Sequence, residues 1–302
     1  MKRRSPKTES KLNVQYCFRT GEELPDAIGR ILAEQLTRAV QVLSRPGDSL
    51  EGAVHEARRC LKRARSVLRL VKFAIPNTYR RENGRLRDVG RSLSELRDSH
   101  ALIQTLDDLE GHRKTRRANA FRDAHTFLES RAEEIAKAMD AGGMQNSIAQ
   151  LKTALTHIEK LSFAKVNAPG IANSLYRSVK RGRKAFAAAQ ADTDPEKFHD
   201  LRKRAKDLRY QVSLFAELRP DLEQYSSRAK DLEQLLGDDH NLAVLTDILG
   251  GIQDPGGELH LIREKISGRQ SALRDKATKI GDRLYRRKKV WKDRLAAIAA
   301  EP

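Results

Sequence analysis

The chain has 302 residues, with 59 lysines and arginines against 41 aspartates and glutamates, and therefore a formal net charge of +18. Such an excess of positive charge attracts polyanions, namely nucleic acid, an anionic membrane surface or polyphosphate, but does not select among them. Glycine, proline and aromatic residues are scarce, which favours an all-helical protein. Two cysteines, Cys17 and Cys60, support neither a disulfide framework nor a zinc site.

The hydropathy pattern bears on where the protein is found. No stretch approaches 18 consecutive apolar residues, so we expect no membrane span. The N-terminal residues MKRRSPKTES carry no apolar segment after their charges, which argues against secretion. We therefore expect a cytoplasmic protein whose residues 1–20 form a basic, disordered tail.

The first part of the chain has four stretches of apolar residues at helical spacing. Leu24-Pro25-Asp26 opens the first stretch, and Arg45-Pro46-Gly47 ends it. Asp48 or Ser49 caps the second stretch, and Ile75-Pro76 is expected to end it because proline cannot continue a helix. The expected helices cover residues 24–45, 49–75, about 86–109 with a bend, and 114–139.

Ala141-Gly142-Gly143 is a helix-stop signal, and we place the boundary between two halves of the chain there. A short helix at residues 148–161 leads into the second half, in which Asp194-Pro195 opens a helix and Arg219-Pro220 ends it. The other expected helices of this half cover residues 171–190, 222–243 and 258–297. Each half has four amphipathic helices, and such helices bury their apolar stripes most simply as a bundle. The sequence thus predicts an all-α protein of two four-helix bundles.

Two of the expected helices share one pattern. Residues 54–71 (VHEARRCLKRARSVLRLV) and 198–215 (FHDLRKRAKDLRYQVSLF) each combine an apolar stripe with a neighbouring basic stripe. The basic stripes consist of His55, Arg58, Lys62, Arg65 and Arg69 in the first helix and of His199, Arg202, Lys206 and Arg209 in the second. The order His, Arg, Lys, Arg of the first stripe recurs in the second stripe. The distance along the chain between the two copies is the same as that between Pro76 and Pro220. We therefore predict an internal duplication, with a pseudo-twofold axis between the bundles and both stripes facing one groove or one side of the molecule.

The basic stripes indicate an anionic partner. Like charges three and four residues apart on a helix repel by about 0.2–0.5 kcal/mol per pair, so the arrangement costs stability in both helices. His55 to Arg65 covers about 15 Å of helix, which suits a linear polyanion better than a single phosphate. Tyr210 is the main aromatic residue near the stripes, so the bases of single-stranded nucleic acid would find few stacking partners. The pattern favours a phosphate chain without bases.

The same residues carry a family resemblance. The order His55, Arg58, Lys62, Arg63, Arg65, with its second copy at His199, Arg202, Lys206 and Arg209, resembles the signature of the CHAD family, the conserved histidine α-helical domain. The Leu-x-Asp elements around Asp98 and Asp238 also match, and the resemblance extends from about residue 20 onward. One departure is Asp207, at the place of Arg63 in the first copy. It either weakens the second stripe or pairs with a base such as Lys203 or Arg204.

The resemblance implies one CHAD domain over residues 21–302, with half-repeats at 21–142 and 143–302. It further implies a non-enzymatic protein without a cofactor, which binds inorganic polyphosphate and can associate with polyphosphate granules. The stripes and the resemblance together mark as polyphosphate-binding His55, Arg58, Arg59, Lys62, Arg63, Arg65, Arg69, His199, Arg202, Lys203, Lys206 and Arg209.

The two histidines that begin the stripes allow other roles. His55 and His199 could donate to a carboxylate or to the backbone within the bundle. They could also bind a metal with partners drawn from His100, His240, Asp98 and Asp238, but no HExxH-like pair is present and we expect no metal. If they contact phosphate, a bound anion raises their pKa, and affinity should then increase below about pH 6.5.

Two other functions stay open. A metal-dependent phosphohydrolase would have only Asp98 and the Asp238-Asp239 pair as carboxylates, and we expect these to pair with nearby bases, since no glycine-rich phosphate loop is present. The second open function is that of a generic scaffold that binds polyanions or nucleic acid. A charge of +18 alone gives nonspecific binding to nucleic acid at low salt. No helix-turn-helix or membrane-binding amphipathic helix stands out. The pattern does not define an oligomeric state.

Overall fold

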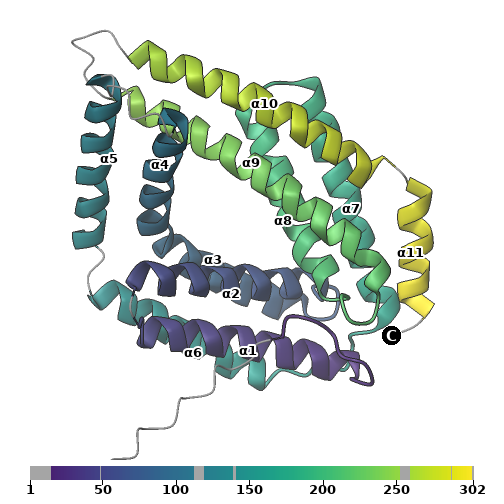
Figure 1. Cartoon of the computed structure of the whole chain (residues 1–302). Coiled ribbons are helices and arrows are strands. Elements are labelled where there is room, and N and C mark those ends of the chain that lie inside the picture. Colours follow the sequence, from purple (N-terminus) through teal and green to yellow (C-terminus); the bar gives the residue numbers. More distant parts are fainter. Residues whose placement is uncertain are drawn as a thin grey trace, which may run out of the picture.

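The computed structural model of the protein describes residues 15–47, 49–111, 119–138, 141–251, 259–286 and 288–300. These residues form α-helices and one short 3-10 helix and no strand, so the predicted all-α fold is confirmed (Figure 1). The α-helices are α1 (Leu24–Ser44), α2 (Leu50–Leu70), α3 (Pro76–Ser92), α4 (Ser94–Glu110), α5 (Asn119–Ala138), α6 (Ala141–Glu159), α7 (Ala168–Ala191), α8 (Pro195–Ser213), α9 (Glu223–Leu249), α10 (Leu259–Tyr285) and α11 (Lys288–Ala300). The 3-10 helix η1 (Pro220–Leu222) precedes α9.

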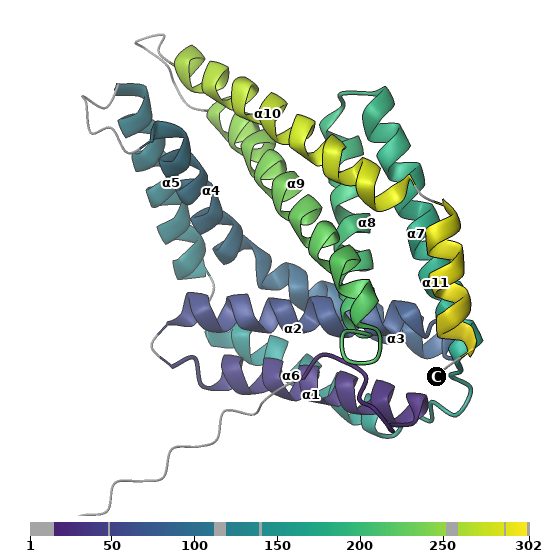
Figure 2. The same ribbon diagram turned by 45° about the vertical axis from the view of Figure 1, so that its right-hand side comes forward.

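Four helices make a first bundle. α1 packs against α2 and α6, and α3 closes the ring by packing against the same two helices. This bundle occupies the lower part of Figures 1 and 2. The predicted boundary between the halves, near residue 142, falls at the start of α6, so a helix assigned to the second half packs among helices of the first. The division into half-repeats at 21–142 and 143–302 and the internal duplication remain predictions.

The second bundle contains the later helices. α8 lies between α7 and α9, α9 packs on α10, and α11 returns along α7. α7 and α10 approach closely where Gly182 faces the ring of Tyr285 and Gly281 faces the ring of Phe186, because neither glycine has a Cβ to keep the ring away. One hydrophobic core runs without interruption from α1 to α11 through the contact of α2 with α7 and α8. The two bundles therefore share their interior.

The helices α4 and α5 stand apart as a pair. α3 ends at Ser92, the chain bends at Leu93, and α4 then rises away from the first bundle (Figures 1 and 2). Its apolar side chains and those of α5 form a second, smaller core with the end of α9 and the start of α10. Helices from the N-terminal part of the chain thus cover helices near its C-terminus.

Several helix ends differ from the predicted ones. Pro76 and Pro220 do not end helices, because α2 stops at Leu70 and α8 at Ser213, and each proline instead lies in the first turn of the next helix. Proline is favoured there, since the first turn of a helix needs no amide donor. The Ala141-Gly142-Gly143 segment opens α6, and the expected final helix is two helices, of which α10 ends at Tyr285 and α11 begins at Lys288. Ser49 caps α2 by accepting a hydrogen bond from the amide of Gly52, whereas Asp48 lies outside the described residues.

The predicted disordered tail was set too long. Residues 1–14 lie outside the described part of the chain, but Phe18 is only 1% exposed and its amide donates to the Leu214 carbonyl at 2.7 Å. Its ring also packs edge-on against Phe215, with 5.1 Å between the ring centroids. Burial of an aromatic side chain supplies the free energy that orders this segment. Among the helices described, none has an apolar stretch long enough to cross a membrane.

Candidate polyanion-binding cleft

The two basic helices meet at one cleft. Their apolar stripes are buried, for example Leu61 and Leu68 of α2 and Leu201 and Leu208 of α8, and this places the neighbouring basic stripes beside the contact between the two helices. The cleft has a volume of about 460 Å³. Nine bases and one acid, Asp207, line it. The bases are Arg58, Lys62, Arg65, Arg69, Arg87, Arg91, Lys203, Arg204 and Lys206.

Half of the predicted binding residues are brought together in this cleft. α2 contributes four members of its stripe, spaced three and four residues apart, and α8 contributes two predicted residues. These six are Arg58, Lys62, Arg65, Arg69, Lys203 and Lys206. The cleft therefore holds most of the α2 stripe but only Lys206 of the α8 stripe, and the predicted groove shared by both whole stripes remains a prediction.

The other predicted residues do not line the cleft. Arg59 pairs with Glu56 one turn earlier, the guanidinium of Arg63 lies 5.0 Å from the centre of the Tyr16 ring, and Arg209 donates to Glu233 of α9 at 2.7 Å. His55 is exposed at the start of α2, and Arg202 lies against Gly237 of α9. His199 stacks on His240, with ring centroids 4.2 Å apart.

Three lining bases were not predicted. Arg87 and Arg91 come from α3, and Arg204 comes from α8. Arg87 and Arg91 are four residues apart and thus share one face of α3, but this pattern has no second copy and gave no reason to select it. Arg204 donates to Asp200 at 2.9 Å, and Arg87 donates to its neighbour Asp88 at 2.8 Å.

Burial and mutual repulsion act on Lys62, Arg65 and Lys206 of the cleft. Burial, and then the nearby charges of Lys206 and Arg58, lower the pKa of Lys62 to about 8. Burial and then Arg202 also lower the pKa of Lys206. Burial and then Arg69 lower the pKa of Arg65 to about 10. The cleft thus concentrates positive charge where the protein alone stabilises it poorly, and an anion that enters would relieve this cost.

Some bases of the cleft also hold the structure together. The Nη1 of Arg58 donates to the carbonyls of Leu93 and Ser94 at 3.2 and 2.9 Å, at the bend between α3 and α4. It also lies 3.4 Å from the carboxylate of Asp98, which we expected from the sequence to pair with a nearby base. Arg69 pairs with Asp207 at 2.7 Å across the contact between α2 and α8. Asp207 therefore pairs with a base of the other helix, and neither Lys203 nor Arg204 is its partner.

The stacked histidines change the expected dependence on pH. Burial, and then His240 and the bases of α8, lower the pKa of His199 to about 4, and burial also lowers the pKa of His240. His199 is therefore neutral at pH 6.5 in the free protein, and a contact with phosphate that charges it would have to take up a proton. Among the described residues, neither histidine belongs to a group of three side chains that could hold a metal.

The fold and the cleft define a class, an all-helical protein in which two basic helices from separate bundles meet at one cationic cleft. The family model of the CHAD domain matches residues 27–250, and the chain belongs to this family. Its structure is similar to the crystal structure of the CHAD domain from the plant Ricinus communis, with a TM-score of 0.58, 17% identity and 98% of each chain covered. A comparison with curated proteins gave no match.

Proposed function

We propose that the cleft binds inorganic polyphosphate and that the protein is not an enzyme. The observation that carries the proposal is the meeting of the α2 stripe with bases of α3 and α8 in one cleft lined by nine bases and one acid. Arg58 to Arg69 extends over about 16 Å of α2, so the cationic surface can follow a chain of phosphates. Arginine binds phosphate oxygens through two parallel hydrogen bonds, and lysine acts as a point charge.

The absence of aromatic surfaces favours a phosphate chain over a nucleic acid. Tyr210 is the one aromatic residue that lines the cleft within the described part of the chain, and it is buried beneath the guanidinium of Arg209 at 5.1 Å. Proteins that bind single-stranded nucleic acid gain about 1–3 kcal/mol per stacked base from exposed aromatic rings. Inorganic polyphosphate has no bases, so the lack of exposed aromatic rings in this cleft costs it no binding free energy. The proposal includes a cytoplasmic location of the protein and its association with polyphosphate granules.

A generic polyanion-binding scaffold is the second candidate, and a separate basic surface favours it. Lys180, Arg183 and Lys184 of α7 lie beside Lys289 and Lys292 of α11 around another hollow. Charge there acts on any polyanion at low salt, nucleic acid included. A phosphohydrolase has less support, because Asp98 approaches Arg58 and Asp239 pairs with Arg274 at 2.8 Å.

A competition experiment separates the first two candidates. Labelled long-chain polyphosphate is bound at about 150 mM salt, where generic attraction is strongly screened, and is then displaced by duplex DNA, single-stranded RNA or heparin. We expect polyphosphate to resist displacement at equal concentrations of phosphate or sulfate groups. Even competition by the nucleic acids would instead support the generic scaffold.

Binding should also depend on pH in an alkaline range. Lys62 of the free protein has a pKa of about 8, and a bound polyanion favours its charged form. Below that pKa the lysine is already charged and the affinity should be constant. Above pH 8 binding must take up a proton, and the affinity should fall by up to about tenfold per pH unit for each such lysine. Titration of the affinity from pH 6 to 9.5 at constant ionic strength measures this.

The Lys62→Arg variant is the control, because arginine keeps its charge throughout the range. Its affinity should decline less above pH 8 than that of the wild type. A wild-type affinity that stays constant to pH 9.5 would exclude Lys62 from the contact with the ligand.

A further inference from the structure

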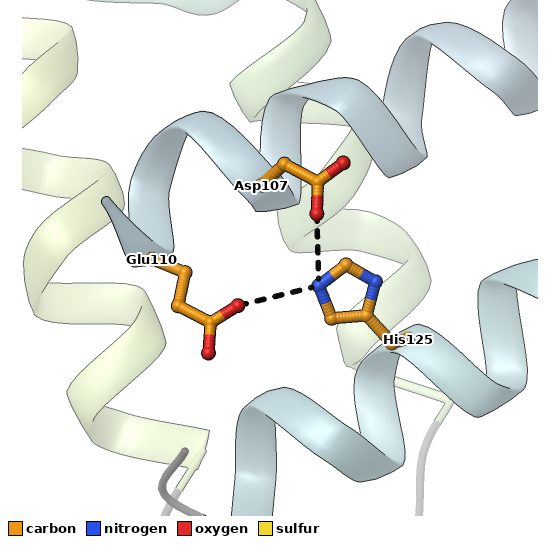
Figure 3. A group of neighbouring side chains, drawn as sticks. All are labelled: Asp107, Glu110 and His125. Atoms are coloured by element: carbon orange, nitrogen blue, oxygen red, sulfur yellow. Dashed lines mark ion pairs between the residues drawn. The ribbon is translucent and has the colours of Figure 1, made fainter. Parts of the chain in front are cut away.

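A second group of functional side chains lies far from the cleft, at the end of the α4–α5 pair. Asp107 and Glu110 are three residues apart on the last turn of α4 and point toward His125 of α5 (Figure 3). The Nε2 of His125 is 3.3 Å from Oδ1 of Asp107 and 3.7 Å from Oε2 of Glu110. All three potential ligand atoms lie within 4.8 Å of one another.

The state of His125 points to a ligand between these groups. Its side chain is only 6% exposed, yet its Nε2 has no hydrogen-bond partner, although it faces two carboxylates. A buried polar atom is normally satisfied, so an exception of this kind needs an explanation. The two distances are also longer than a normal hydrogen bond. A cation held by all three atoms would satisfy the imidazole nitrogen.

The charge at this helix end favours a cation as well. The last turn of α4 carries no base, and it contains Asp107, Asp108 and Glu110 at the negative end of the helix dipole. Acidic side chains at that end destabilise a helix. Among the described residues, Lys265 of α10 is a nearby base, and its ammonium group lies on the ring of Phe121 and donates to the carbonyl of Leu109 at 3.4 Å.

We propose that Asp107, Glu110 and His125 bind a divalent transition-metal ion, with Zn²⁺ as the best match. One imidazole nitrogen and two carboxylate oxygens are ligands that Zn²⁺ accepts. Ligands at about 2.0–2.1 Å from a tetrahedral zinc ion are about 3.3 Å apart, close to the spacing found here. Asp107 is half exposed and leaves a path for the ion and a fourth position for water. The ion would tie α4 to α5.

The test uses the full-length protein stripped of metal by chelation. Zn²⁺ is titrated in competition with a chromophoric chelator, and thermal unfolding is followed with and without one equivalent of Zn²⁺. We expect the wild type to bind one equivalent and to unfold at a higher temperature with zinc. Asp107→Asn should lower the zinc affinity by at least about tenfold and abolish the shift in unfolding temperature.

Asp108→Asn is the matched control. It removes the same charge from the same helical turn, but Asp108 accepts a hydrogen bond from Gln104 and lies outside the group. This variant should keep the affinity and the shift. Since Asp107 is half exposed, its replacement by asparagine does not depend on repacking a core, whereas His125→Gln serves as a second variant if it folds. Equal zinc affinity of the wild type and Asp107→Asn, or no binding by the wild type, would overturn the proposal.

Discussion

Replacement of both Lys62 and Lys206 by methionine should lower the affinity for long-chain polyphosphate by about 100-fold at 150 mM salt without lowering the stability of the protein. Two charge-assisted contacts are lost, each of about 1.5 kcal/mol or more, and 1.4 kcal/mol corresponds to a factor of ten. The fold should tolerate the change, because burial and repulsion already lower the pKa of both ammonium groups. Methionine keeps an unbranched side chain that is one atom shorter and removes the buried charge.

Affinity and unfolding temperature together make this measurement decisive. Fluorescence anisotropy gives the affinity, and circular dichroism gives the unfolding temperature, which should stay the same or rise. Lysines with a structural role would give the opposite result, with a loss of stability and an unchanged affinity. Arg58 is less suitable for this purpose, since its guanidinium also donates to the backbone carbonyls of Leu93 and Ser94.

The matched control removes two lysines from the other basic surface. Lys180 and Lys184 of α7 lie outside the cleft, and their replacement by methionine changes the net charge by the same amount. We expect the affinity to fall by less than about fivefold, because screened charges away from the ligand contribute little at this salt concentration. If both pairs of substitutions weaken binding equally, net charge governs binding and the generic scaffold is the better description.

Asp239→Asn should lower the free energy of unfolding by about 3 kcal/mol, the largest stability effect that we expect here. Asp239 is 2% exposed and accepts from Nε and Nη2 of Arg274 at 2.8 and 3.4 Å. Arg274 also donates to the carbonyl of Thr193 and lies over the ring of Phe198. The carboxylate thus joins α9 to α10 and, through Arg274, to the start of α8. Urea unfolding followed at 222 nm measures the loss.

The neighbouring residue supplies the control for this substitution. Burial raises the pKa of Asp238, so its charged form is disfavoured in the folded protein. Asp238→Asn should therefore leave the stability unchanged or increase it slightly. If Asp239→Asn is as stable as Asp238→Asn, the contact with Arg274 is not structural, and the carboxylate would be free for the chemistry of a phosphohydrolase.

The sequence predicted the helical fold and the face of α2 that lines the cleft. Both follow from local periodicity, since residues three and four apart on a helix share a face whatever surrounds it. The same reasoning was weaker for α8, where Lys206 lines the cleft but Arg209 turns to Glu233 of α9. That acid is distant in the sequence, and only tertiary packing brings it to the helix.

Other parts of the sites could not be read from periodicity at all. Arg87 and Arg91 reach the cleft because α3 packs beside α2, and one sequence does not reveal which helices become neighbours. The group of Asp107, Glu110 and His125 likewise depends on α4 and α5 lying side by side. The prolines misled for a local reason, since the same residue is compatible with the end of one helix and the first turn of the next.

The packing of α4, α5 and α6 also means that neither half of this chain is complete alone. α6 belongs to the later part of the sequence and fills the first bundle, whereas α4 and α5 come from the earlier part and cover α9 and α10. A chain cut near residue 142 would give two fragments, each with an apolar face whose cover is on the other fragment. Each part of the chain supplies helices that cover the other part. The cleft between α2 and α8 therefore forms only when the whole chain is folded.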